Sequence, residues 1–282
     1  MGDSPLARQE VAAVGLDGKV WVIGGLVSRG ATPAVQAYDP RSDAWRAGPD
    51  LPLALHHPMA VAYRGEIVVL GGYLATGTNE FAGVSDRVFA LRRGAWVELP
   101  PMPRPRGAGA AAVVADRIVV VGGAADNRLV PESEVFDGSR WHDAAPIPTP
   151  RDHLAAASLG NTVYAVGGRP LDASHNFATL ERYDPDADRW SRLPDMPTPR
   201  GGLGAAIAGN RLVALGGEEP GGVIGAVEQY DVGAATWSSL PRMRTPRHGL
   251  GVVVVGDVLY AMVGGLHPGV APTVTAEALT VP

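Results

Sequence analysis

Cysteine is absent from this 282-residue chain, and lysine occurs once, at Lys19, among 24 basic residues. The lack of cysteine excludes disulfides, thiolate nucleophiles and cysteine-ligated zinc, and it makes folding independent of the redox compartment. The predominance of arginine over lysine is typical of a GC-rich genome and carries little functional information. No run of about 18 apolar residues occurs, so we expect no transmembrane helix and no membrane contact.

Charge and composition restrict the class of protein further. The formal net charge of −5 argues against nucleic-acid binding, because neutralising phosphates needs a basic face. Met1 to Pro5 contain neither a basic n-region nor an apolar h-region, so we expect no signal peptide and a cytoplasmic location. The absence of cysteine leaves secretion open as the alternative, and we expect a monomer. The 37 glycines and 25 prolines lack the three-residue period of collagen, which favours many short strands joined by turns.

A double glycine recurs six times along the chain, at intervals of 45 to 51 residues. The pairs are Gly24-Gly25, Gly71-Gly72, Gly122-Gly123, Gly167-Gly168, Gly216-Gly217 and Gly264-Gly265. Each pair closes an apolar run of strand length, such as Ile118 to Val121, and a tight turn precedes most of the runs. A strand of small residues, such as Ala110 to Ala112, comes before that turn. This self-similarity predicts one repeated structural unit.

An aromatic residue followed by a tryptophan comes after each of the first five double glycines. The pairs are Tyr38 with Trp45, Phe89 with Trp96, Phe136 with Trp141, Tyr183 with Trp190, and Tyr230 with Trp237. We interpret them as a third and a fourth strand, with the tryptophans filling the space between neighbouring units near the rim.

The order of arginine, small-residue strand, turn, apolar strand, Gly-Gly, loop, Glu-x-Tyr-Asp-Pro and tryptophan resembles the kelch repeat. Six copies cover nearly the whole chain. The resemblance implies an all-β fold, a six-bladed β-propeller with one four-stranded blade per repeat, as a single domain over residues 1–282.

The sixth copy is incomplete, because no tryptophan strand follows its third strand around Ala276 to Leu279. In many kelch propellers, a strand from the other end of the chain closes the blade that contains a terminus. Two outcomes remain open here: Asp3 to Ala7 pairs as a short outer strand, or the blade has three strands.

One arginine position recurs sixteen residues before the first glycine of each pair. It reads Arg8, Leu55, Arg106, Arg151, Arg200 and Arg247, the last counted with one extra residue in its second strand. The resemblance places this position at the mouth of the axial channel and implies that it holds acidic peptides. Because the planar guanidinium suits carboxylate and phosphate groups, we predict that Arg106, Arg151, Arg200 and Arg247 bind ligand.

A structural role for the same arginines is the alternative. The guanidinium groups would then tie adjacent blades together, and the third strands offer partners in Glu134, Glu181, Glu228 and Glu277.

Histidines and two long loops gather at the same mouth. His57 and His153 fall two places after the arginine position, and His56 and His248 fall one place after it. Positions on blades two and four should stand roughly 10 Å apart, too far for ligands of one zinc ion, so we expect no metal and no cofactor. His57, His153 and His248 are therefore assigned to ligand binding.

The loops after the double glycine are longest in blades two and four. They carry Tyr73 and Phe81 in blade two, and His175 and Phe177 in blade four. Long loops on a rigid scaffold usually carry function, so we predict these four residues as further binding elements.

Two functions remain open at this stage. The first is a binding propeller that takes a protein segment or an anionic small molecule at the channel mouth. The second is an isomerase, lyase or cyclase that uses the mouth as its active site, for instance by pairing Glu10 or Asp152 with a mouth histidine. No Gly-x-Ser-x-Gly motif occurs, and without cysteine the copper-tyrosine cofactor of galactose oxidase is excluded.

Overall fold

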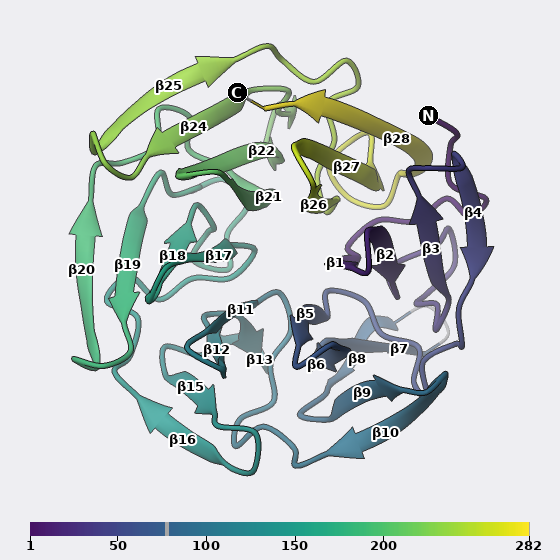
Figure 1. Cartoon of the computed structure of the whole chain (residues 1–282), viewed down its shortest axis with the longest axis horizontal. Coiled ribbons are helices and arrows are strands. Elements are labelled where there is room, and N and C mark those ends of the chain that lie inside the picture. Colours follow the sequence, from purple (N-terminus) through teal and green to yellow (C-terminus); the bar gives the residue numbers. More distant parts are fainter. Residues whose placement is uncertain (77–78, 282) are drawn as a thin grey trace.

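Six antiparallel sheets surround one axis in the computed structural model, which describes residues 1–76 and 79–281 (Figure 1). Each sheet is one blade, and the blades follow one another around the axis in chain order. No helix lies in the described ranges, so none there could span a membrane. The predicted six-bladed, all-β propeller is confirmed.

The strands of each blade run from the axis to the rim. The innermost strands are β1 (Ala12–Leu16), β5 (Met59–Tyr63), β11 (Ala110–Val114), β17 (Ala155–Leu159), β21 (Gly201–Ala208) and β26 (Gly251–Val255). The second strands are β2 (Lys19–Ile23), β6 (Glu66–Leu70), β12 (Arg117–Val121), β18 (Thr162–Val166), β22 (Arg211–Glu219) and β27 (Val258–Gly265). The third strands are β3 (Val35–Asp39), β9 (Val88–Arg92), β15 (Ser133–Phe136), β19 (Leu180–Asp184), β24 (Val227–Asp231) and β28 (Pro272–Thr280).

Five blades have a fourth strand, and short strands occupy the loops after the double glycines. The fourth strands are β4 (Ala44–Ala47), β10 (Ala95–Leu99), β16 (Trp141–Ala144), β20 (Arg189–Leu193) and β25 (Thr236–Leu240). The loop strands are β7 (Tyr73–Thr76) with β8 (Asn79–Val84), β13 (Ala124–Ala125) with β14 (Arg128–Leu129), and β23 (Gly222–Val223), which pairs with β22.

The hydrophobic core lies between adjacent blades, because the neighbouring blades cover both faces of the second strand of each blade. Val119 and Val121 of β12 pack in one cluster with Val163 of β18, and all three are fully buried. A strand that is buried on both faces carries a continuous apolar run. The apolar runs in the sequence therefore mark the second strand of each blade.

The double glycines allow neighbouring blades to approach closely. A Cβ atom added to Gly122 would lie 2.6 Å from the carbonyl oxygen of Arg151 in the next blade, and Gly123 N–H donates to that oxygen at 2.9 Å. In blade 6 this pair is Val263-Gly264, shifted by one from the predicted Gly264-Gly265. Val263 adopts φ 49° and Gly264 bonds to the carbonyl of Arg8, so Arg247 needs no extra residue in its count.

The five tryptophans that follow the aromatic residues lie on the outermost strands, as predicted, whereas the sixth, Trp21, lies on β2. Each of the five outer indole N–H groups donates to a backbone carbonyl of a neighbouring segment, as from Trp96 to Pro49 (2.9 Å) and from Trp237 to Pro194 (2.8 Å). In the other four pairs the aromatic residue stands directly opposite its tryptophan, whereas blade 2 differs. The register places Leu91 opposite Trp96, and Phe89 two residues earlier on the same face.

Blade 6 has three strands, which decides between the two predicted closures. β28 pairs with β27 over its length, so the strand around Glu277 lies where the sequence placed it. The N-terminal segment reaches its edge, where Ser4 N–H donates to the carbonyl of Val274 at 2.8 Å. The N-terminal segment therefore lies beside β28, with the two chain ends at opposite ends of this strand (Figure 1).

Deleting residues 271–282 should lower the melting temperature by about 10 °C or more. The deletion removes β28, exposes the edge of β27 and uncovers Leu259 and Ala261, which pack against Leu279 and Val281. Differential scanning calorimetry of the truncated and full chains measures the change. An unchanged melting temperature would show that β28 does not contribute to closing the propeller.

Candidate functional site

A closed ring of six backbone hydrogen bonds surrounds the axis at the channel mouth. Each member lies two places after the arginine position, and its N–H donates to the carbonyl of the same position in the preceding blade over 2.7 to 3.1 Å. The members, named here the mouth ring, are Glu10, His57, Ala108, His153, Gly202 and Gly249. All six have φ between 50° and 65°, the left-handed region, which costs a residue other than glycine about 1–3 kcal/mol.

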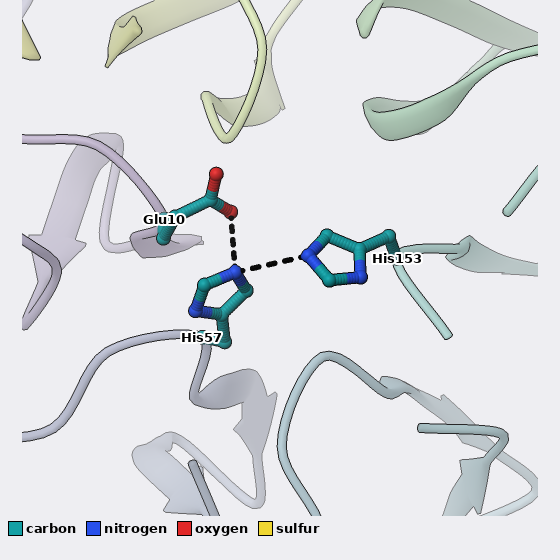
Figure 2. A group of neighbouring side chains, drawn as sticks. All are labelled: Glu10, His57 and His153. Carbon is teal, nitrogen blue, oxygen red and sulfur yellow. Dashed lines mark hydrogen bonds and ion pairs between the residues drawn. The ribbon is translucent and has the colours of Figure 1, made fainter. Parts of the chain in front are cut away.

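Three side chains of the mouth ring meet at the axis (Figure 2). Glu10 Oε2 lies 3.0 Å from His57 Nε2, and His57 Nε2 lies 3.1 Å from His153 Nε2. The expected separation of roughly 10 Å between blades two and four is therefore wrong at the level of the donor atoms. The left-handed backbone directs both imidazoles across the channel toward each other.

The residues just before three mouth-ring positions, His57, His153 and Gly249, contact the axial cluster. His56 Nδ1 lies 2.6 Å from His57 Nδ1, and Asp152 Oδ2 lies 3.1 Å from His153 Nδ1. The Asp152–His153 contact is close enough for an ion pair, but its atoms are not aligned as in a good hydrogen bond. His248 Nδ1 lies 3.0 Å from Glu10 Oε1, so this histidine joins the cluster from blade 6.

Burial and neighbouring charges fix the protonation of the cluster. Burial opposes ionisation of Glu10, but His57 and His248 outweigh it and hold the pKa of Glu10 well below its usual value. Burial also disfavours the charged form of His248, yet Glu10 and Glu218 raise its pKa to about 9. Burial and the Arg169 guanidinium lower the pKa of His153. Near neutral pH, the cluster holds a carboxylate at Glu10, an imidazolium at His248 and a neutral His153.

The five arginines do not line the channel mouth. Arg8, Arg106, Arg151, Arg200 and Arg247 are fully buried, with 0% of each exposed. Arg151 is typical: its Nε donates to the carbonyl of Gly167 at 2.7 Å and one terminal nitrogen lies 2.6 Å from Glu181. Arg106, Arg200 and Arg247 pair in the same way with Glu134, Glu228 and Glu277. The geometry is that of a structural role, but each guanidinium ties together strands of its own blade, whereas the alternative had placed these ties between adjacent blades.

Blade 2 shows an apolar version of the same arrangement. Leu55 occupies its arginine position, and the register places Phe89 where blade 3 has Glu134. Both residues are buried, at 0% and 2% exposed. Replacing a buried ion pair by apolar residues of similar volume is often neutral, so this blade retains the fold without the pair.

The long loops differ in how they contribute to the mouth. Phe81 is 57% exposed, and its ring centroid lies 5.1 Å from that of Tyr73 and 5.3 Å from that of His56. Tyr73 is buried, and its hydroxyl donates to the carbonyl of Ala124 at 3.0 Å. Both therefore belong to the site.

The predicted residues of the blade 4 loop have other environments. His175 Nδ1 lies 2.5 Å from Asp172 within its own exposed turn. Phe177 is half-buried, and its backbone N–H donates to the carbonyl of Gly168 at 2.7 Å. Neither side chain has a described contact with the cluster at the axis, so the structure does not bring them together with His57, His153 and His248.

Arg169 and Glu218 are site residues that the sequence reasoning missed. Their side chains lie 2.7 Å apart, and Glu218 lies 3.6 Å from His248. Ion-pair contacts therefore run from Arg169 through Glu218 and His248 to Glu10. Both residues follow a double glycine directly, as Tyr73 does, and this position is the signal that could have identified them.

A cavity of about 400 Å³ lies above blade 3, beside the mouth ring. It is lined by Tyr73, Phe81, Gly83, Val84, Ala124, Asp126, Asn127, Asp152, His153, Arg169 and Leu171. Blade 3 supplies Ala124, Asp126 and Asn127 here, and its β13–β14 hairpin is short. The longer loops of blades 2 and 4 therefore enclose space that blade 3 leaves open; we call it the blade 3 cavity.

Replacing Arg151 by leucine should destabilise the protein by about 3–5 kcal/mol, because Glu181 would remain buried without its partner. The double variant R151L/E181F copies blade 2 and should recover most of that loss. Chemical denaturation measures both free energies of unfolding. Arg140→Ala is the control, since this exposed arginine should contribute about 0–1 kcal/mol. Unchanged stability of R151L would contradict the structural role.

Comparisons with known proteins agree with the repeat analysis. The family model KLHDC2/KLHL20/DRC7 Kelch-repeats domain matches residues 56–265, and the Kelch motif model matches residues 7–52. The Kelch repeat protein M-T8 of Myxoma virus is 32% identical over 139 residues, 48% of this chain and 26% of that protein. Beta-scruin of Limulus polyphemus is 32% identical over 148 residues, 49% of this chain and 16% of that protein.

A solved structure supports the same fold over the full length. YjhT superposes with a TM-score of 0.86, covering 100% of this chain and 97% of YjhT at 15% identity. The chain spans about a quarter or less of the two curated relatives named above, so the likeness to them concerns the repeats. With a family model matching residues 56–265 and six blades in the structure, the chain belongs to the kelch-repeat family of β-propellers.

Proposed function

We propose that this propeller is a binding module that takes a segment of a partner protein in the blade 3 cavity. The observation that carries the proposal is the position of two exposed apolar side chains. Phe81 is 57% exposed and Leu171 is 45% exposed, and both line this one cavity. Exposed apolar groups that gather at a concave surface are typical of interaction sites. Kelch propellers commonly bind proteins, which agrees with this role.

The charges around the cavity favour a ligand of mixed character. Asp126 and Asp152 line the cavity with one arginine, Arg169, which is already paired with Glu218. Because the pKa of His153 is lowered, this histidine is neutral near neutral pH and adds no positive charge to the cavity. Because the five repeat arginines are buried, a purely acidic segment or anionic small molecule finds little cationic surface here. We infer a segment that combines an apolar side chain with hydrogen-bond donors.

The size of the cavity supports a short inserted segment. A volume of about 400 Å³ falls at the lower part of the range of ligand pockets, which hold small molecules or a few side chains. An apolar anchor between Phe81 and Leu171 would be buried by both loops, and buried anchors of this kind supply most of the affinity of an interface.

Peptides selected from a random displayed library should bind the protein and contain an aromatic or large aliphatic residue. Phe81→Ala should weaken their binding at least about tenfold, because the mutation removes one wall of the anchor site. Fluorescence polarisation of a labelled peptide measures the dissociation constant. Val97→Ser is the matched control, since Val97 is exposed to 40% on the outer strand β10 and should leave affinity unchanged.

Equal affinity of the selected peptides for the wild type and for F81A would contradict the proposed cavity. Selection of acidic peptides whose binding is lost in Arg169→Ala would contradict the inferred ligand chemistry and support the anionic ligand instead.

A further inference from the structure

We propose that Glu10, His57 and His153 of the mouth ring bind one divalent transition-metal ion on the propeller axis, with zinc as the ion that best fits the donors. The proposal does not depend on the partner-binding function, although His153 also lines the blade 3 cavity. It rests on the geometry of the three donor atoms, on their outer contacts, and on the backbone conformation that positions them.

The donor atoms are spaced as metal ligands are. One carboxylate oxygen and two imidazole nitrogens lie within 4.8 Å of one another. The two shorter separations are 3.0 Å and 3.1 Å, both centred on His57 Nε2 (Figure 2). Two ligands of a tetrahedral zinc ion stand about 3.3 Å apart when each bond is about 2.05 Å long. To hold one tetrahedral ion, the two shorter separations would widen slightly, and the third, between Glu10 and His153 and within 4.8 Å, would adjust to the same length.

The hydrogen bonding of the cluster is incomplete without a cation. His57 Nε2 faces both Glu10 Oε2 and His153 Nε2, and one N–H cannot point well at two acceptors. Two imidazole lone pairs that face each other at 3.1 Å repel. A cation placed between the three atoms accepts a lone pair from each, which removes both problems.

Outer contacts orient all three ligands toward the axis. Asp152 approaches His153 Nδ1 and His56 approaches His57 Nδ1, so the Nε2 atom of each ring is left to face the channel. His248 holds the second oxygen of Glu10. Ligating histidines in metal sites usually have a carboxylate or another polar partner on the other ring nitrogen. Here each ligand has one, from the residue just before it or from blade 6.

The backbone gives an independent reason to assign a function to these side chains. All mouth-ring positions have left-handed φ, and blades 5 and 6 use glycine there. Glutamate and histidine are retained at three positions despite the strain, and strained residues are enriched at functional sites.

The remaining mouth-ring residues leave coordination positions open. Ala108, Gly202 and Gly249 offer no donor side chain, and a small space of about 80 Å³ adjoins the three ligands. Two histidines and one glutamate with an open position are the donor set of catalytic zinc sites, whereas structural sites use four protein ligands. Imidazole donors suit zinc and other late transition metals, while magnesium and calcium prefer oxygen ligands.

The test is a zinc titration of the full chain after removal of bound metal with a chelator. We expect one zinc ion per chain after gel filtration, measured by elemental analysis, and a rise in melting temperature on adding zinc. Cobalt(II) in place of zinc should give the visible absorption of a four- or five-coordinate ion.

Glycine variants separate metal binding from folding. H57G and H153G introduce the residue that blades 5 and 6 already carry, so the backbone ring is kept. Without zinc, these variants should melt at the wild-type temperature or above. With zinc, they should show no rise and at least a hundredfold weaker binding. Asp152→Asn should weaken zinc binding about tenfold, because it removes the negative charge that contacts Nδ1 of His153 and leaves the three ligands in place.

His175→Gly is the matched control, because His175 is an exposed histidine beside a carboxylate, Asp172. It should bind zinc as the wild type does. The proposal is overturned if the wild type binds less than one zinc ion per chain, if H57G and H153G bind it with unchanged affinity, or if H175G loses it equally.

Discussion

The mouth ring is the constraint on which the rest of this propeller depends. Six inter-blade hydrogen bonds close around the axis only if every blade presents both an N–H and a C=O at the same point. That requirement imposes a left-handed backbone at the six positions and turns their side chains toward the channel. Any side chain longer than a methyl group at this position therefore becomes part of the axial cluster. The same six residues thus close the propeller through their backbone and place their side chains at the axis.

The buried charged residues discussed above form two groups with different roles. The repeat arginines are buried within single blades, where each guanidinium donates to backbone carbonyls, and four of the five also pair with a third-strand glutamate. The second group, Glu10, His248, Glu218 and Arg169, connects different blades across the mouth. The first group maintains the blades. The second sets the electrostatic environment of the channel and of the blade 3 cavity.

The repeat spacing and the five tryptophans predicted the blades and the outer strands, because periodic burial leaves a periodic sequence. The site was predicted only in part. Counting along the chain placed Arg151 near the mouth, but it could not tell that its guanidinium turns into the blade toward Glu181. The same count identified His57 and His153 as mouth residues. It could not predict that they touch, because their contact depends on a positive φ, which the residue type histidine does not indicate. Arg169 directly follows a double glycine, as Tyr73 does, so its position could have been predicted, but its pairing with Glu218 of the next blade could not.

Hydrogen exchange of the six mouth-ring amides tests most directly whether this ring closes the propeller. Amide exchange followed by NMR reports each of them separately. The account predicts that the amides of Glu10, His57, Ala108, His153, Gly202 and Gly249 exchange together and only on global unfolding, with the slowest class of strand amides. Exchange of these amides at the rates of exposed loops, while the second strands stay protected, would contradict it.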